Sequence, residues 1–253
     1  MPFPDLNIEF DNILLEEQQS HIERQIKEPL LGRYSPSDIP YCLRRQYYDF
    51  YIPRPIPPAN IRIMEAGNMT HEWIAKMLQR MTERNIFHGK IQTLESEKPF
   101  IIAVDTNDDI AIHGRYDNFL ILNQLNTSER YLIEVKSQKS LYYTTDYKKE
   151  HGIQIMPYMY MQKPCKGIFI YVDRASYDMK IFPTPPNGLD YDPKIMSLIF
   201  SRTKLLDGYI KSQTLPPAEA KQSKDTIYQC SYCPWKVECD AADLLNKKWI
   251  KQP

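Results

Sequence analysis

Glycine is scarce in this chain, with 8 residues among 253, whereas proline occurs 20 times. No stretch matches the G-x-x-x-x-G-K-[ST] phosphate-binding loop, whose backbone amides hold a nucleoside triphosphate. The absence of that loop excludes a P-loop helicase or ATPase fused within these residues. The sequence also shows no internal repeat and no low-complexity tract, which excludes solenoid and array architectures.

Long hydrophobic runs and net charge are also missing. No apolar segment approaches the roughly 20 residues that a membrane-spanning helix needs. The N-terminal MPFPDLNIEF lacks the basic and apolar regions of a secretory signal. We therefore expect an intracellular, cytoplasmic protein with no membrane association. Lys and Arg together number 32, as do Asp and Glu, so any nucleic acid must be bound by a local basic patch.

Cysteine is rare, with five residues, which is an odd number. An odd count in a chain without a secretory signal argues against a disulfide framework. Three of the five lie close together in CSYCPWKVEC, as Cys230, Cys233 and Cys239. This spacing favours ligation of a metal ion or cluster over disulfide bonding.

Hydrophobic periodicity divides the chain into the helices and strands of an α/β protein. We expect helices over residues 35–51, 64–83, 148–163 and 191–212, and strands over 99–104, 110–122, 131–137 and 167–173. Residues 1–34 are predicted to form a helical extension, and residues 35–253 a single domain. Within that domain a helix, three strands in a meander, a helix and a strand indicate a mixed central sheet with flanking helices.

The segment YLIEVKSQKS combines a buried-strand pattern with two opposite charges, Glu134 and Lys136. Because side chains alternate along a strand, these two share one face, while Ile133 and Val135 occupy the other. A surface ion pair would explain the two charges taken alone. The preceding predicted strand, however, carries an isolated carboxylate, Asp117, which antiparallel pairing would bring beside Glu134.

Two neighbouring carboxylates repel each other unless a cation lies between them. Mg²⁺ and Mn²⁺ prefer oxygen ligands and retain open positions for water and phosphate. We therefore expect Asp117, Glu134 and the backbone carbonyl of Val135 to bind Mg²⁺ or Mn²⁺. Lys136 would then orient or deprotonate the attacking water and stabilise the charge of a phosphodiester transition state. His71, on the helix before the sheet, would cap the site, although a lone helical histidine is often structural.

These residues together resemble the signature of the PD-(D/E)XK nucleases, in which an aspartate precedes a Glu-x-Lys strand. Gly67-x-x-x-His71 before the signature resembles the RecB-like branch of that family. The resemblance implies a restriction-endonuclease-like core with a set of named roles: metal ligands His71, Asp117 and Glu134, and the catalytic lysine Lys136.

A second RecB-like feature follows the catalytic strand, where Gln154-x-x-x-Tyr158 lies on the next predicted helix. The resemblance implies that Gln154 and Tyr158 support the active site or contact DNA. The sequence departs from a regular helix at Pro157, which lacks a backbone N–H and is expected to kink the helix.

The cysteines suit four-thiolate ligation, with Cys42 far upstream joining Cys230, Cys233 and Cys239. Spacing alone allows either Zn²⁺ or an iron–sulfur cluster. One ligand from before the core and three from after it resemble the cluster of RecB-like nucleases. The resemblance implies a [4Fe–4S] cluster that joins both chain ends, with zinc or [2Fe–2S] as alternatives. Residues 35–58 and 226–253 would then form an iron–sulfur subdomain around a core at residues 64–212.

Two basic and aromatic segments are candidates for holding nucleic acid. The first contains Arg44 and Arg45, and the second contains Tyr142, Tyr143 and Lys148. Tyrosine rings can stack on unpaired bases, and nearby cations bind phosphates. Any one of these tyrosines can equally be a core or rim residue.

The leading prediction is a metal-dependent DNA exonuclease that acts on single-stranded or overhanging ends. The segment YCLRRQYYDFY and the single-domain length resemble the CRISPR-associated exonuclease family. That resemblance implies a role in CRISPR adaptation, as well as contact with the integrase complex. A repair or viral RecB-like nuclease, or a non-catalytic DNA-binding iron–sulfur subunit, stays open as an alternative.

Overall fold

The computed structural model describes residues 5–27, 31–52, 56–86, 91–105, 107, 109–124, 127–184 and 187–250. In chain order its elements are α1 (Leu6–Lys27), β1 (Arg33–Tyr34), α2 (Leu43–Tyr51), α3 (Pro58–Glu83), β2 (Ile91–Asp105), β3 (Ile110–Gln124), β4 (Thr127–Gln138), α4 (Lys149–Gln162), β5 (Lys166–Asp173), β6 (Met179–Phe182), α5 (Pro193–Lys211), two short 3₁₀ helices, η1 (Glu219–Gln222) and η2 (Ile227–Ser231), and α6 (Lys236–Ile250). Among these described helices, none has the length and apolar character required to cross a bilayer.

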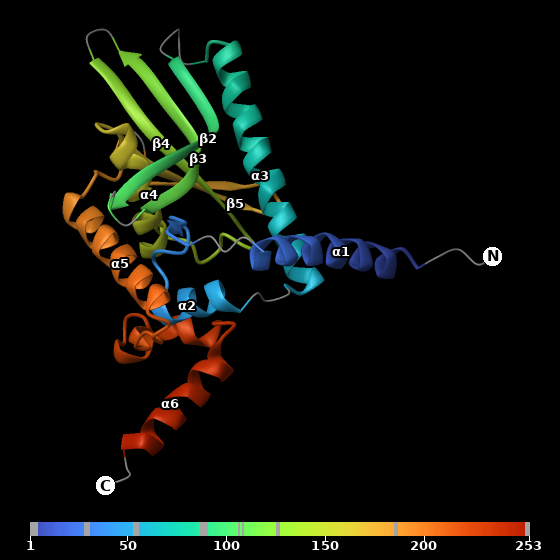
Figure 1. Cartoon of the computed structure of the whole chain (residues 1–253). Helices are drawn as coiled ribbons and strands as arrows, with labels where there is room; N and C mark the ends of the chain where they lie inside the picture. The colour runs from blue at the N-terminus through green and yellow to red at the C-terminus, as the bar shows by residue number, and fades with distance from the viewer. Residues whose placement is uncertain are drawn as a thin grey trace.

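A six-stranded mixed sheet forms the centre of the molecule, with helices on its flanks, as the sequence predicts (Figure 1). The strands β2, β3 and β4 form an antiparallel meander, and β5 then pairs parallel to β4. The helix α4 makes the crossover between these two parallel strands, which is the usual way to connect parallel neighbours. At the far edge, β6 pairs antiparallel with β5.

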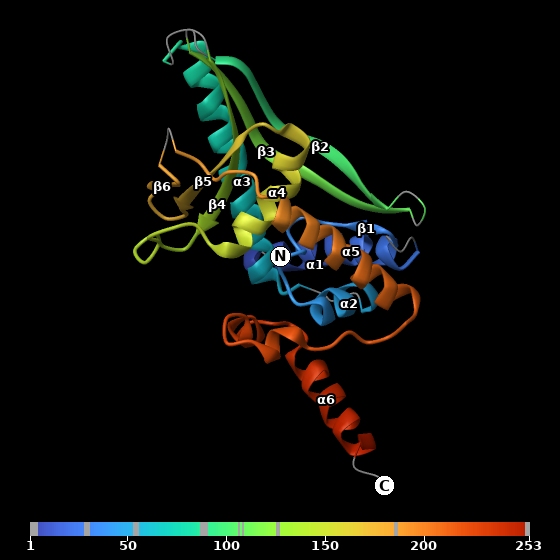
Figure 2. The same ribbon diagram turned by 90° about the vertical axis from the view of Figure 1, so that its left-hand side faces the viewer.

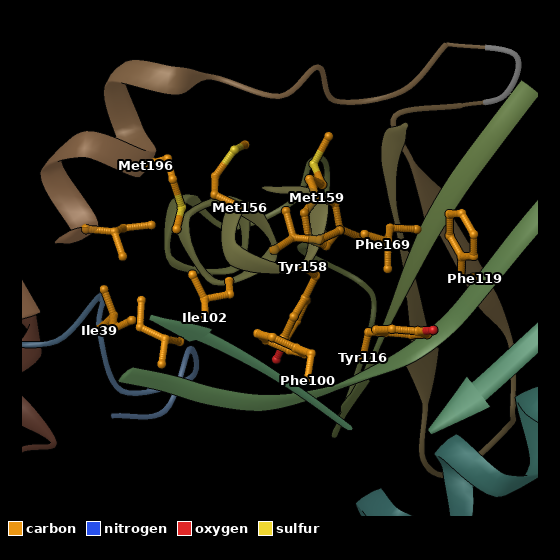
Figure 3. Packing of buried hydrophobic residues seen from close by; sticks show 14 of the residues in the cluster. Ile39, Phe100, Ile102, Tyr116, Phe119, Met156, Tyr158, Met159, Phe169 and Met196 are labelled. Atoms are coloured by element: carbon orange, nitrogen blue, oxygen red, sulfur yellow. The ribbon is translucent and has the colours of Figure 1, made fainter. Parts of the chain in front are cut away.

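The two faces of the sheet bury different hydrophobic clusters. One cluster places Phe169 and Tyr171 of β5 against Met156 and Met159 of α4, and Met196 of α5 adds to it (Figure 3). The other cluster packs Ile74 of α3 against residues of β3, β4 and β5 that include Ile133 and Val135. Both faces of β4 are therefore covered over residues 131–135, which explains why this stretch is apolar apart from Glu134.

Three predicted boundaries are wrong, and prolines account for each of them. The helix predicted from residue 35 begins instead at Leu43, and Ser35 and Asp38 lie in turns joined by backbone hydrogen bonds. The helix predicted from residue 64 begins instead at Pro58, because proline is well tolerated in the first turn. The strand predicted from Pro99 is the end of a longer strand that begins at Ile91, and Pro99 lies on the outer edge of the sheet.

The ends of the chain extend away from this sheet. Helix α1 lies across the lower end of α3, and α6 projects from the rest of the molecule in both views (Figures 1 and 2). The predicted N-terminal extension is helical over α1, but its last two residues, Arg33 and Tyr34, pair in parallel with β3. The sheet therefore includes the end of the segment that the sequence assigns to the extension.

Candidate active site

The site lies where β3 and β4 separate. Their backbone ladder ends at the pair formed by Asn118 and Ile133. One residue further on, the side chain of Asp117 takes the place of a backbone partner. Its Oδ2 accepts a hydrogen bond of 2.7 Å from the backbone N–H of Val135. Continuing the register places Asp117 opposite Glu134, as the antiparallel pairing predicts. Both carboxylates are buried.

Glu134, Lys136 and Gln154 form a closed hydrogen-bonded triangle. The ammonium of Lys136 donates to Oε1 of Glu134 at 2.7 Å and to Oε1 of Gln154 at 2.9 Å. The side-chain amide of Gln154 donates to the same Glu134 oxygen at 2.7 Å. Strand β4 therefore supplies Glu134 and Lys136, and Gln154 of α4 holds both side chains in place by hydrogen bonds.

Burial and the nearby charges shift the pKa values of this triangle. Burial raises the pKa of Glu134, and repulsion from Asp117 raises it further, against the opposing effect of Lys136, to about 7. Burial lowers the pKa of Lys136, but the charges of Glu134 and Asp117 outweigh it and leave the pKa above its ordinary value. The arrangement thus holds a protonated amine beside a carboxylate that is costly to ionise without a further cation.

His71 and Glu97 complete an acidic group on the other side of Asp117. His71 Nδ1 lies 3.2 Å from Asp117 Oδ1 and 3.9 Å from Glu97 Oε1. Ligand atoms of these three residues all lie within 4.8 Å of one another, which is the reach of one metal ion. Burial lowers the pKa of His71, but its hydrogen bond to Asp117 and the charge of Glu134 raise it above its ordinary value.

Glu97 is the site residue that sequence reasoning missed. The register of β2 with β3 pairs Ser96 with Asn118 and Lys98 with Tyr116, so Glu97 falls opposite Asp117. Its backbone has a positive φ of 55° and interrupts the ladder at this point. Burial and the charge of Asp117 raise its pKa, and an ion pair of 2.7 Å with Arg115 opposes the shift. Following the β2–β3 hairpin past Pro99 would have found it.

Tyr158 lies one turn beyond Gln154 on the same helix and is buried. Its ring packs edge-on against Phe100 of β2, with ring centroids 5.1 Å apart (Figure 3). Burial, and then the charge of Glu134, raise the pKa of its phenol. The helix α4 continues through Pro157 to Gln162, so the proline does not end it.

The four cysteines with predicted ligand roles line one pocket between α2, η2 and the start of α6: Cys42, Cys230, Cys233 and Cys239. All four are free and partly buried. Within the described residues, no three cysteine sulfurs lie within 4.8 Å of one another. The fifth, Cys165, lies apart from them beside the core, and burial raises its thiol pKa to about 12.

Arg44 does not occupy the exposed position that a DNA contact requires. Its guanidinium is buried and donates to the carbonyl of Pro216 at 2.7 Å and to Asp243 at 2.5 Å. The Sγ of Cys239 lies 3.5 Å from the same nitrogen that contacts Asp243. These contacts place Arg44 in the lining of the cysteine pocket, and its contact with DNA stays a prediction. Arg45 is more exposed and stacks over the ring of Tyr41.

The loop after β4 carries the other predicted DNA contacts. Tyr142 and Tyr143 are 79% and 89% exposed, and their rings meet edge-on with centroids 4.7 Å apart. Lys148 is exposed at the start of α4, where its backbone N–H donates to the Tyr171 hydroxyl. All three residues are thus exposed to solvent after the end of β4.

Comparisons with known proteins relate the chain to a nuclease family. The family model for the PD-(D/E)XK nuclease superfamily matches residues 36–240. A solved structure titled "Crystal structure of SSO0001" matches with a TM-score of 0.53 and 17% sequence identity, covering 90% of this chain and 95% of that one. At this identity the match establishes a common fold only. No curated protein sequence matches.

The matched range contains all the residues of the buried triangle and the acidic group, and it extends from before the first cysteine to beyond the fourth. Because the family model covers well over half of the sequence, this protein is a member of the PD-(D/E)XK nuclease superfamily.

Proposed function

We propose that the protein is a metal-dependent deoxyribonuclease that removes nucleotides from single-stranded or overhanging DNA ends. The observation that carries the proposal is the convergence of three carboxylates, a histidine and a protonated lysine where β3 and β4 separate. Membership of the superfamily supports phosphodiester hydrolysis. The preference for single strands and for ends rests on the exposed tyrosines after β4 and on the resemblance in sequence.

The donor set suits a hard divalent cation. Asp117, Glu97 and Glu134 offer carboxylate oxygens, and His71 offers one nitrogen, which fits Mg²⁺ or Mn²⁺ better than a soft metal. The carbonyl of Val135 points to the same strand edge as its N–H, so it faces Asp117 and can add a ligand. When bound, the cation would polarise the scissile phosphate and lower the pKa of an attacking water.

The protein's own groups would position the substrate and absorb charge. Lys136 is protonated and held by Glu134 and Gln154, so its ammonium can donate to a phosphate oxygen as negative charge builds up there. Gln154 keeps the amine and the carboxylate in fixed positions. Tyr158 and the hydrophobic cluster below it exclude water from the inner side of the triangle.

The test is cleavage of end-labelled and internally labelled single-stranded DNA in the presence of Mn²⁺. The parent protein should release nucleotides, and Lys136→Ala should abolish release while still binding DNA. Lys76→Ala is the matched control, because Lys76 is an exposed lysine on α3 that forms an ion pair with Glu72. Equal degradation by the parent and by Lys136→Ala, or no cleavage by the parent with either Mn²⁺ or Mg²⁺, would refute the proposal.

We also propose that the cysteine pocket binds a [4Fe–4S] cluster, forming a subdomain from residues 35–58 and 226–253. The four thiolates face one pocket, and Arg44, Arg45, Lys221 and Lys236 line it as well, which suits an anionic ligand. A single Zn²⁺ with bonds of about 2.3 Å would hold its thiolates roughly 4 Å apart or closer. A cluster binds each thiolate to a different iron and holds the thiolates further apart. The resemblance in sequence to RecB-like nucleases favours the cluster over zinc.

Iron content, together with the absorption spectrum of the purified protein, tests the cluster. A preparation made without oxygen should be brown and contain about four irons per chain, and Cys230→Ala should bleach it. A colourless protein containing one zinc per chain and no iron would refute the cluster. The task in CRISPR adaptation, with an integrase complex as partner, rests on the resemblance alone. Neighbouring genes for an integrase and a repeat array would support it.

A further inference from the structure

Three tyrosines that the proposed catalytic machinery does not use lie together between the cysteine pocket and the nuclease site. They are Tyr228 and Tyr232, which flank Cys230 on and beside η2, and Tyr41, which precedes Cys42. Tyr228 and Tyr232 are 44% and 54% exposed, and their ring centroids are 6.1 Å apart. Exposed aromatic pairs of this kind present π-faces to solvent.

A buried glutamine attaches the two segments to each other. Gln229, between Tyr228 and Cys230, accepts a hydrogen bond of 3.2 Å from the backbone N–H of Cys42 and donates one of 3.5 Å to the carbonyl of Pro40. These two contacts hold the peptide groups on both sides of Tyr41. The positions of the three tyrosines relative to one another are therefore fixed by the fold.

Cationic and catalytic groups lie close to the same rings. The guanidinium of Arg45 lies 4.1 Å from the centre of the Tyr41 ring. The side chains of Tyr41 and of Glu150 of α4 lie near the Tyr232 side chain. Tyr41 also lies near Lys136. The tyrosines therefore form a series that leads from the catalytic amine to the outer surface of η2.

Tyr228 also lines a cleft of about 690 Å³, and the first turn of α4 contributes Lys149 and Glu150 to the same lining. Gln154 of the catalytic triangle follows one turn later. The lining has four acidic side chains, Asp146, Glu150, Glu219 and Asp225, against the two basic ones of Lys149 and Arg202, so it is net acidic. An acidic lining repels phosphates but not uncharged bases, so a nucleic acid would enter base-first with its backbone outside.

We propose that Tyr41, Tyr228 and Tyr232, with Arg45, form a stacking platform for the unpaired bases of a single strand whose end lies in the nuclease site. This inference rests on the proposed function, and it specifies the substrate as a single strand with at least two unpaired bases beyond the scissile bond. Stacking of a base on an aromatic ring tolerates every sequence, because each base has a π-face. The platform therefore predicts a preference for unpaired DNA without sequence specificity.

Binding of fluorescent oligothymidylate to the Lys136→Ala protein tests the platform without cleavage. Adding Tyr228→Ala and Tyr232→Ala should weaken binding roughly 5- to 100-fold, the range expected for loss of base stacking. Adding Tyr228→Phe and Tyr232→Phe should leave binding within about twofold, because stacking needs the ring and not the hydroxyl. Loss of binding with phenylalanine as well as alanine would overturn the inference, as would unchanged binding with alanine.

A set of oligonucleotides with one abasic position each then locates the contact. An oligonucleotide that lacks the base facing the platform should bind the Lys136→Ala protein more weakly than the intact oligonucleotide does. The same missing base should cause no further loss of binding when Tyr228 and Tyr232 are also replaced by alanine. The inference would be overturned if, at every abasic position, the loss of affinity from the missing base and the loss from the alanine substitutions multiplied. Failure of the proposed function has a different signature, because the parent protein would then cut no DNA with either Mn²⁺ or Mg²⁺, whether or not it binds. A parent that cuts single strands while the alanine variant binds normally refutes the platform alone.

Discussion

Asp117 Oδ2 accepts the hydrogen bond from Val135 N–H that a neighbouring strand would otherwise satisfy. The Asp117 side chain thus ends the β3–β4 backbone ladder. The ladder stops beside Glu134 and Lys136, which project from the same face of the sheet. The same contact holds the Asp117 carboxylate rigidly beside two other acidic groups. The sheet consequently concentrates negative charge at its own opening, where a divalent cation is the natural partner.

Substitutions at Asp117 should separate its structural role from its role as a ligand. Asp117→Asn removes the charge and keeps an oxygen that can accept from Val135, whereas Asp117→Ala removes both. Both variants should lose Mn²⁺ binding in calorimetry. Only the alanine variant leaves a buried N–H without a partner, so its unfolding free energy should lie about 1–3 kcal/mol below that of the asparagine variant. Equal stability of the two would show that the hydrogen bond contributes nothing.

Glu97→Gln should weaken Mn²⁺ binding and lower cleavage at limiting metal concentration, because it removes one of the two carboxylates in the group formed by His71, Glu97 and Asp117. Excess Mn²⁺ should partly restore the rate. The matched control is Glu65→Gln, which changes an exposed carboxylate on the same helix as His71. If Glu97→Gln retains the parent's dependence on metal concentration, Glu97 serves only to pair with Arg115.

Gln154→Ala should slow cleavage by roughly 10- to 100-fold, the usual effect of removing a group that orients active-site residues. The loss should fall on kcat and leave KM nearly unchanged, because Gln154 contacts Glu134 and Lys136 and not bulk solvent. Steady-state kinetics on a short single-stranded substrate measure both values. A rise in KM at unchanged kcat would place Gln154 in substrate binding instead.

The metal-free protein should lose stability as pH rises from about 4.5 to 7. The pKa of Glu134 is raised from 4.5 to about 7 on folding, so over this window the folded state binds more protons than the unfolded state. The raised pKa of His71 acts in the same direction, because its stabilising charge is lost at higher pH. Urea unfolding in the presence of a chelator measures this loss. The titration of Glu134 alone should lower the folded-to-unfolded ratio by at most about tenfold for each unit of rising pH.

Two comparisons isolate the cause of that pH dependence. Glu134→Gln cannot titrate at this position, so its stability should change less across the same window. Mn²⁺ should stabilise the parent more at pH 8 than at pH 5, because deprotonated ligands bind the cation. A metal-free parent that gains stability between pH 5 and 7, or whose slope Glu134→Gln leaves unaltered, would contradict the assignment.

The sequence predicts the sheet and the neighbouring positions of Asp117 and Glu134, because both follow from local alternation. The apolar pattern around Glu134 and Lys136 identifies β4, and the isolated Asp117 in an apolar strand identifies its neighbour. Antiparallel pairing then brings the carboxylates together without further information. The contact of Lys136 with Gln154 depends instead on the crossover helix α4, which connects the parallel strands β4 and β5 and packs beside β4.

The sequence does not predict two features, the place of Glu97 and the burial of Arg44. The first depends on the register of strands far apart in the chain, and the second on which distant residues bind the guanidinium. Glu97 reaches Asp117 only because β2 continues through Pro99, and proline ordinarily marks the end of a strand. Arg44 resembles its neighbour Arg45 in sequence, yet one is buried against α6 and the other is stacked on Tyr41. That difference is set by residues nearly two hundred positions away, which local patterns do not encode.

Arg44 should fasten α6 beside the cysteine pocket, because its guanidinium joins Asp243 of α6 to the carbonyl of Pro216. Arg44→Met should lower the melting temperature, because it removes the donor to the Pro216 carbonyl and one of the two cations that pair with Asp243, the other being Lys221. Arg44→Lys should recover only part of the loss, because an ammonium cannot reproduce the planar fork. The control is Lys224→Met, which removes an exposed cation between η1 and η2 that is outside the set of residues lining the cysteine pocket. If a cluster is bound, Arg44→Met should also bleach faster in a chelator. A variant that melts and bleaches like Lys224→Met would show that Cys239 is held in place without Arg44.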